Sequence, residues 1–141
     1  MKMWNYYMIK ILHVDLGAHG DMKDITDEVR KFVKESGKKD GAVLVFAKGS
    51  TGAVTTIEYE PGLKKDFPRV MDKIAPYNDY YEHHKTWGDD NGSSHVKASI
   101  IGPSIIVPFK DGELLLGTWQ QIVIINFDTR PRRREVILQI L

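Results

Sequence analysis

The sequence has 141 residues, with 20 basic and 19 acidic side chains and a formal net charge of +1 at pH 7. A chain of this length is expected to form a single domain, 1–141, and so balanced a charge gives no global field that would attract nucleic acid or an anionic membrane. It contains no cysteine, which excludes disulfides, thiolate nucleophiles and cysteine-ligated metal. Any metal must therefore be bound by His, Asp, Glu or water.

No stretch approaches the roughly 18 apolar residues that a membrane-spanning helix needs. The N-terminal residues lack a continuous apolar core and a small-residue cleavage site, so no signal peptide is predicted and a cytoplasmic location is expected.

The first half of the chain alternates between strand and helix patterns. Residues 4–15 mix aromatic and β-branched side chains, which predicts a strand. A helix is predicted next, with Asp24 as its cap and Gly37 as its end. Further strands are predicted at 42–46 and 53–60. The apolar positions of the helix follow an i, i+4, i+7, i+8 spacing: Ile25, Val29, Phe32 and Val33.

A second helix is predicted after the turn at Pro61–Gly62, with its end at Pro76. A polar loop follows, and then a short third helix is expected, capped by Ser93 or Ser94 and ended by Gly102. The apolar side chains expected to face the core are Leu63, Phe67, Val70, Met71 and Ile74 in the second helix, and Val96, Ile100 and Ile101 in the third.

From residue 103 onward the pattern is all strand, with a two-residue hairpin turn at Asp111–Gly112. This order of elements predicts an α+β fold. We expect a mainly antiparallel sheet, with a two-layered sandwich as one form of it, and two or three helices packed on it.

The stretch from Tyr77 to Gln120 concentrates the residues that could carry chemistry. Neutral imidazole is the commonest protein ligand for zinc, and catalytic zinc sites keep three protein ligands and one open position. The spacing of the histidines matches no standard helix pair, so a polar surface loop without a ligand is an equal alternative. The candidates in this loop are His83, His84 and His95, with Asp89, Asp90 and Asn91 among them.

Other features each have a structural and a functional interpretation. Trp119 offers a flat stacking surface and Gln120 a donor and an acceptor, although a Trp at a strand corner is commonly buried. Glu58 and Glu60 would share one strand face, as an acid–base pair, as metal ligands or as a solvated surface. The arginines of residues 130–134 could bind phosphate or an acidic partner, but charge protecting an edge strand is the favoured interpretation.

Several motifs in this order resemble the YjbQ-like family of small proteins. They are Y-E-H at Tyr81–His83, N-x-x-x-H at Asn91–His95, K-A-x-x-x-G-P-S at Lys97–Ser104, V-P-x-x-D-G-x-L at Val107–Leu114, L-G-T-W-Q at Leu116–Gln120 and R-P-R-x-R at Arg130–Arg134. The segment from Ser36 to Leu63 fits the strand-loop-strand pattern of the same family.

The resemblance implies a homo-oligomer, in the first place a trimer of α+β subunits, with a pocket near the subunit boundary. It also implies a divalent metal, zinc first and magnesium as the alternative. The roles that it implies are metal ligation by His83 and His95 with His84 as a further candidate, catalysis by Asp90, Asn91 and Gln120, and substrate binding by Trp119, Glu60, Ser50 and Thr51.

The chain also departs from the commoner pattern of that family. Ser50 stands where many members carry a histidine, Glu58-Tyr59-Glu60 stands in place of an N-E-N motif, and Asn126 replaces a glutamate. If the missing histidine is a ligand, the site must recruit His84, Glu60 or water instead.

The function that the resemblance implies is a metal-assisted enzyme acting on a small phosphorylated substrate. The specific reaction implied is secondary thiamin-phosphate synthesis from a thiazole phosphate and a pyrimidine methyl diphosphate. Two alternatives stay open: a non-catalytic trimeric protein that binds a small anion, and a metal-dependent phosphoester hydrolase. Neither a nucleic acid nor a membrane is expected as a partner.

Overall fold

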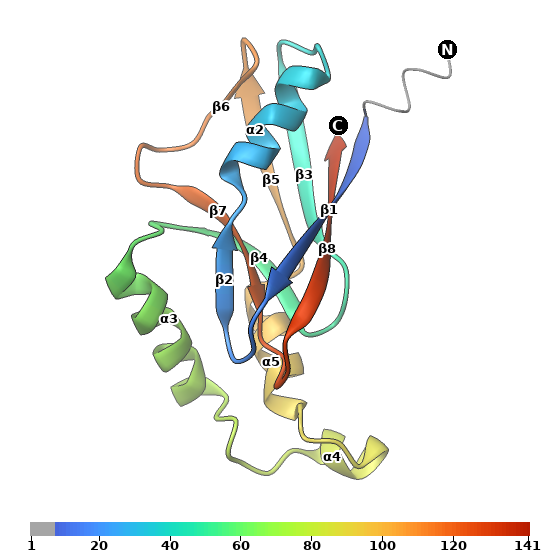
Figure 1. The fold of residues 1–141 in the computed structure, drawn as a ribbon, viewed down its shortest axis with the longest axis vertical. Helices are drawn as coiled ribbons and strands as arrows, with labels where there is room; N and C mark the ends of the chain where they lie inside the picture. Colours follow the sequence, from blue (N-terminus) through green and yellow to red (C-terminus); the bar gives the residue numbers. More distant parts are fainter. Residues whose placement is uncertain (1–7) are drawn as a thin grey trace.

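The structure is a computed structural model that describes residues 8–141, and its strands form two antiparallel sheets packed face to face (Figure 1). The large sheet has the order β1-β8-β3-β5-β6, and the small sheet the order β2-β7-β4. The strands are β1 (Ile9–Leu16), β2 (Asp21–Asp24), β3 (Gly41–Ala47), β4 (Gly52–Ile57), β5 (Ser104–Lys110), β6 (Glu113–Leu114), β7 (Gln121–Asn126) and β8 (Arg132–Ile140). The predicted antiparallel α+β fold is confirmed.

Four helices complete the described part of the chain: α2 (Thr26–Glu35), α3 (Pro61–Ile74), α4 (Glu82–Trp87) and α5 (Gly92–Ile101). The apolar face of α2 packs into the core between the two sheets, as its spacing predicts. Met71 of α3 and Ala98 of α5 pack on the opposite face of the small sheet. Within residues 8–141, no helix combines the length and apolar character that crossing a membrane requires.

Strand β7 lies at the centre of the molecule, and every residue from Ile122 to Asp128 is buried. Ile122 and Ile124 point into the core between the sheets, whereas Val123 and Ile125 point toward α3 and α5. Because successive side chains of a strand alternate between its faces, a strand covered on both sides needs a continuous apolar run, which β7 has.

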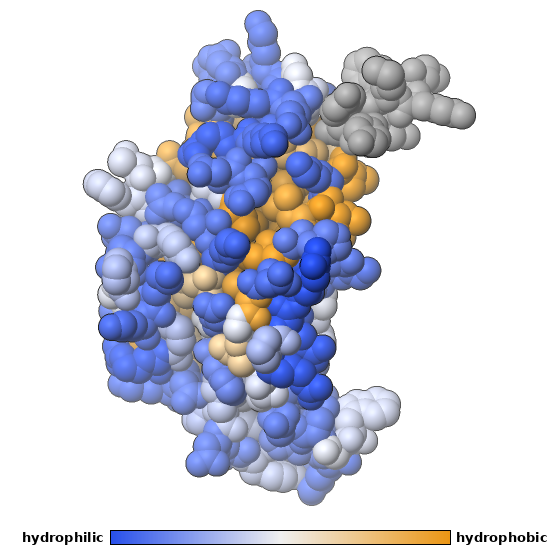
Figure 2. Space-filling view, in the orientation of Figure 1, coloured by the Kyte–Doolittle hydropathy of each residue, from blue (hydrophilic) through white to orange (hydrophobic). Residues whose placement is uncertain are grey.

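The outer face of the large sheet carries apolar side chains that the described residues leave exposed. Ile9 and Ile11 of β1 are each about half exposed, and Ile106 of β5 is 61% exposed. Figure 2 shows apolar side chains gathered around β1. Continuous apolar surface of this kind usually marks a contact with another molecule.

Several local predictions are confirmed. The turn at Asp111 and Gly112 has positive φ at both residues, 51° and 75°, as a two-residue hairpin requires. Gly102 ends α5, and the predicted helix after Asp24 is α2. The N-terminal strand begins at Ile9, and the part of its predicted range from Trp4 to Tyr7 lies outside the described residues.

Other predictions were wrong. The predicted edge strand of the arginine cluster, β8, lies between β1 and β3. Residues predicted as a loop form α4, and the strand β2 was not predicted. Glu58 and Glu60 follow the end of β4 at Ile57, so they do not share a strand face.

The helix faces were also partly mispredicted. On α3, Val70 and Ile74 are exposed, at 44% and 58%, while Met71 is buried. On α5, Val96 and Ile100 are exposed at 40% and 52%, and the chain buries Lys97 instead. Lys97 is tolerated inside because its Nζ lies 3.0 Å from Oδ1 of Asp72 and 3.2 Å from the centre of the Tyr77 ring.

Candidate functional site

Two of the predicted histidines come together at one end of the small sheet. The ring centres of His83, on α4, and His95, in the first turns of α5, are 4.5 Å apart. Nε2 of His83 lies 3.1 Å from Oδ1 of Asp89, and the backbone of Ser50 lies near the imidazole of His95 and acts on its pKa. Three separate segments of the chain therefore meet at the pair.

The third predicted histidine, His84, has a structural contact. Its Nε2 accepts a hydrogen bond of 3.1 Å from the backbone N–H of Gly92, which fixes α4 against the start of α5. A side chain at Gly92 would collide with Tyr81, so glycine is required where the two helices meet. Gly88, with a φ of 68°, ends α4 in the left-handed conformation and lets the chain turn back.

Asn91 connects the histidine pair with a buried carboxylate. One terminal atom of its amide lies 3.0 Å from Nε2 of His83, and the other lies 3.5 Å from Oδ1 of Asp128. With its NH₂ turned toward His83, the amide also donates to Oδ1 of Asp89 at 3.1 Å. Asp90 is exposed and accepts a hydrogen bond of 3.2 Å from the hydroxyl of Thr129.

A buried polar network extends from Asp128 into β8. Nε of Arg132 donates to Oδ2 of Asp128 at 2.8 Å, and the Thr51 hydroxyl donates to the same oxygen at 3.2 Å. Nη2 of Arg134 donates to Oγ1 of Thr51 at 2.5 Å and to Oδ1 of Asn126 at 2.6 Å. The network therefore joins Thr51, which precedes β4, to the end of β7 and to β8, directly beside the histidine pair.

The charge states of the site follow from these contacts. Burial alone would raise the pKa of Asp128, but hydrogen bonds from the backbone of Thr129 and from Arg132 outweigh it and hold the pKa below its usual value. Burial and the neighbouring His83 lower the pKa of His95 from its ordinary 6.5, against the opposing effects of Asp128, Asp89 and the Ser50 backbone. His95 is therefore mostly neutral at pH 7.

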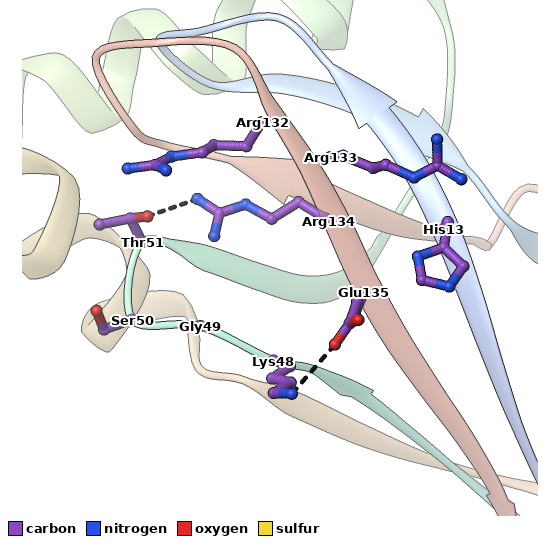
Figure 3. Close-up of a pocket in the computed structure, with 9 residues that line it drawn as sticks. All are labelled: His13, Lys48, Gly49, Ser50, Thr51, Arg132, Arg133, Arg134 and Glu135. Atoms are coloured by element: carbon purple, nitrogen blue, oxygen red, sulfur yellow. Dashed lines mark hydrogen bonds and ion pairs between the residues drawn. The ribbon is translucent and has the colours of Figure 1, made fainter.

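An open pocket of about 590 Å³ lies beside this network. Figure 3 shows the guanidinium of Arg134 directed toward Thr51, and the side chain of Arg133 on the His13 side of β8. Within the pocket wall, Nζ of Lys48 pairs with Oε2 of Glu135 at 3.2 Å. The wall contains four cations and one carboxylate and consists of His13, Lys48, Gly49, Ser50, Thr51, Arg132, Arg133, Arg134 and Glu135.

A metal ion does not fit this donor set as a complete site within one chain. In residues 8–141 there is no group of three or more His, Asp or Glu side chains placed to hold a metal. His83 and His95 supply two imidazoles, one fewer than the protein ligands of a usual catalytic zinc site. His84 uses its Nε2 to hold Gly92, and Glu60 lies elsewhere in the fold.

The remaining predicted residues lie at the other end of the small sheet. Trp119 and Gln120 immediately precede β7, and the first residue of β7, Gln121, pairs with Ile57 of β4. The histidine pair lies near the opposite end of these two strands, where Gly52 pairs with Asn126. Five steps along a strand separate these ends by about 17 Å. Within one chain, then, the indole and the imidazoles do not line a common pocket.

Gln120 and Glu60 have local structural roles, whereas Trp119 is largely exposed. Trp119 is 71% exposed, and Gln120 donates to Oγ1 of Thr56 at 3.1 Å. The carboxylate of Glu60 accepts hydrogen bonds from the backbone N–H groups of Gly62 and Leu63, at 2.8 and 2.5 Å, and so caps α3.

Sequence reasoning did not single out Asp128. It named the arginines of residues 130–134 as an alternative phosphate site but favoured a charged edge strand, and it noted Asn126 only as a departure from the family pattern. A signal for Arg134 was available, because it has the same parity along the strand as Val136, Leu138 and Ile140. Its side chain is consequently directed to the inner face and is only 7% exposed.

Comparisons with known proteins are consistent with one another. Residues 10–141 match the family model described as UPF0047 protein YjbQ-like. A UPF0047 protein of Archaeoglobus fulgidus is 42% identical over 118 residues, which cover 84% of this chain and 89% of the relative. The UPF0047 protein YugU of Bacillus subtilis is 34% identical over 135 residues, covering 95% and 99%.

The chain also resembles solved structures of YjbQ-like proteins. A YbjQ-like protein of unknown function from Sulfolobus solfataricus has a TM-score of 0.87 at 30% identity, covering 94% of each chain. An uncharacterised conserved protein of the YjbQ/UPF0047 family from Clostridium acetobutylicum has a TM-score of 0.86 at 34% identity, covering 94% of this chain and 99% of that one. On the match over residues 10–141 and on these relatives, the chain belongs to the UPF0047, YjbQ-like protein family.

Proposed function

We propose that the protein is an enzyme that acts on a small phosphorylated substrate where the histidine pair meets the cation-lined pocket. The observation that carries this proposal is their adjacency. Ser50 lines the pocket, and its backbone lies close enough to the imidazole of His95 to act on the pKa of that ring. A phosphate held in the pocket would thus leave the rest of a small molecule within reach of the imidazoles.

The residues have separable tasks in this proposal. His95, neutral at pH 7, holds a reacting group in place by hydrogen bonding, and His83 supports it with a second imidazole. Asn91 orients His83 and is itself anchored near Asp128. The exposed carboxylate of Asp90 is the remaining acid–base candidate.

The specific reaction that we propose is the formation of thiamin phosphate. The ring nitrogen of the thiazole phosphate attacks the methylene carbon of the pyrimidine, a C–N bond forms, and the C–O bond to the diphosphate breaks. The diphosphate leaves with the electron pair of that bond. Cations along the pocket stabilise the negative charge that develops on its oxygens.

We also propose that several copies of the chain assemble, in the first place as a trimer. The support is the apolar outer face of the large sheet, with Ile9, Ile11 and Ile106 exposed in one chain. Because Trp119 and Gln120 lie far from the imidazoles of their own chain, only assembly would bring them close to the imidazoles of another copy. Assembly would also let another copy supply the third protein ligand of a divalent ion bound at His83 and His95.

Incubation of the pure protein with the thiazole phosphate and the pyrimidine methyl diphosphate tests the proposal. We expect thiamin phosphate and free diphosphate in equal amounts, and a large loss of product in His95→Gln. Absence of product from a folded wild-type protein, with and without added divalent ions, would refute the reaction. In that case thermal stabilisation by either precursor would favour the alternative, a non-catalytic anion-binding protein.

A further inference from the structure

The pocket wall contains a buried arginine, Arg134, whose guanidinium has an N–H group without a hydrogen-bond acceptor in residues 8–141. Arg134 is only 7% exposed, and both of its hydrogen bonds, to Thr51 and Asn126, start from Nη2. Its Nε is buried and has no hydrogen-bond partner in residues 8–141. Buried guanidinium N–H groups normally have acceptors, because an unpaired one is costly.

The loop from Lys48 to Gly52 lies directly against this guanidinium. Gly49 has a φ of +111°, and a Cβ there would come within 2.9 Å of Nη1 of Arg134. A Cβ at Gly52 would lie 3.1 Å from Nε. Two glycines therefore allow the backbone to approach the guanidinium, and the missing side chain at Gly49 leaves the Nη1 side uncovered.

The charges of the pocket are only partly compensated. Arg132 pairs with Asp128 and Lys48 with Glu135. Among the described residues no carboxylate forms an ion pair with Arg134. Burial and the neighbouring Arg132 also lower the pKa of Arg134 and outweigh the opposing effect of Asp128, which means that the folded chain disfavours the charge of Arg134. An anion in the pocket would reverse that effect.

We propose that Arg134, Lys48 and the loop of residues 49–52 form an oxyanion subsite. This subsite binds the phosphate or diphosphate group of a small organic phosphate. Planar guanidinium groups match the oxygens of phosphate, and small or absent side chains let a backbone come close to it. That the bound phosphate belongs to a substrate rests on the function proposed above. The binding of phosphate or diphosphate to the subsite does not depend on that function.

Calorimetric titration with inorganic phosphate and inorganic diphosphate, at low ionic strength in a buffer without other oxyanions, tests the subsite. We expect saturable binding of both, with diphosphate the tighter. Arg134→Gln should weaken diphosphate binding about tenfold or more, since a hydrogen bond to a charged group contributes about 1.5–3 kcal/mol. Lys48→Gln, at an exposed position, should weaken it severalfold without affecting folding. Arg130→Gln is the matched control, because Arg130 is exposed and does not line the pocket.

The outcomes distinguish the subsite from the enzymatic proposal. Diphosphate binding that falls in Lys48→Gln but not in Arg130→Gln supports the subsite, even if the thiamin precursors give no product. Undetectable binding to the wild type, or equal binding by Lys48→Gln and Arg130→Gln, overturns the subsite even if product forms. If Arg134→Gln does not fold, the Lys48→Gln comparison decides alone.

Discussion

The imidazole rings of His83 and His95 lie 4.5 Å apart although they belong to two different helices. Their approach depends on the short helix α4, on the left-handed residue Gly88 and on the close contact of Gly92 with Tyr81. His95 in turn contacts the backbone of Ser50, at the edge of the cation-lined pocket.

Stability between pH 7.5 and pH 5 should depend on His95. Its pKa is lowered below 6.5 by burial and by His83, so the unfolded chain binds more protons than the folded chain in this range. This contribution to stability is complete above pH 6.5 and is lost as the pH falls toward the lowered pKa.

Thermal melting in the presence of a chelator measures this effect. We expect the melting temperature of His95→Gln to fall less between pH 7.5 and pH 5 than that of the wild type. Identical pH slopes for the two proteins would contradict the lowered pKa. The lowered pKa of Asp128 acts in a separate window, below its ordinary value of 3.8, and does not interfere.

The substitution Asp128→Asn should destabilise the fold by about 2 kcal/mol, because it removes a charged acceptor of hydrogen bonds from a fully buried position. Arg132 and Thr51 both donate to this carboxylate. Asp90→Asn is the control, since Asp90 is exposed and should change stability by less than about 0.5 kcal/mol. Urea unfolding measures both values, and equal effects would mean that the network does not stabilise the site.

Zinc binding, if it occurs on this chain, should depend on His95 and not on His13. We expect the zinc retained after dialysis to drop in His95→Ala and to stay at the wild-type level in His13→Ala, because only His95 lies beside a second imidazole. Elemental analysis gives the metal content of each protein. The same zinc content in both variants would place the ion elsewhere.

Assembly should depend on the outer face of the large sheet. Ile106→Lys places a charge at a position that is 61% exposed in the single chain and should be buried in the trimer, so it should shift the protein toward monomers. Val70→Lys, on the exposed side of α3, should leave the assembly unchanged. Light scattering gives the mass of each, and a trimer of the Ile106→Lys variant would exclude this face.

Much of the fold follows from patterns that are local in the sequence. The run from Ile122 to Ile125 is apolar without interruption, as a strand buried on both faces must be, and the Asp111–Gly112 turn fits its hairpin. Helix faces were harder to predict, because they depend on distant partners. Lys97 is buried on α5 only because Asp72 and Tyr77 receive its ammonium group.

The candidate site could be predicted only in part for a related reason. Histidines stand out by residue type, so His83 and His95 were identified without the structure. Asp128 looks like an ordinary surface charge in the sequence. The parity of Arg134 with Val136 and Leu138 places it on the inner face, but its full burial also depends on the position of β8 between β1 and β3. Trp119 also stands out by residue type. Its distance from the histidine pair could not be predicted, because it depends on how β7 pairs with β4.

The central claim is that the imidazole pair and the cation-lined pocket form one site. Its most direct test is to follow the histidine side-chain NMR signals during titration with inorganic diphosphate, with His83→Gln and His95→Gln for assignment. We predict that the signals of His83 and His95 shift along one saturable curve, while His19, packed against Tyr77, does not respond. Saturable binding that leaves both His83 and His95 unchanged would contradict the claim.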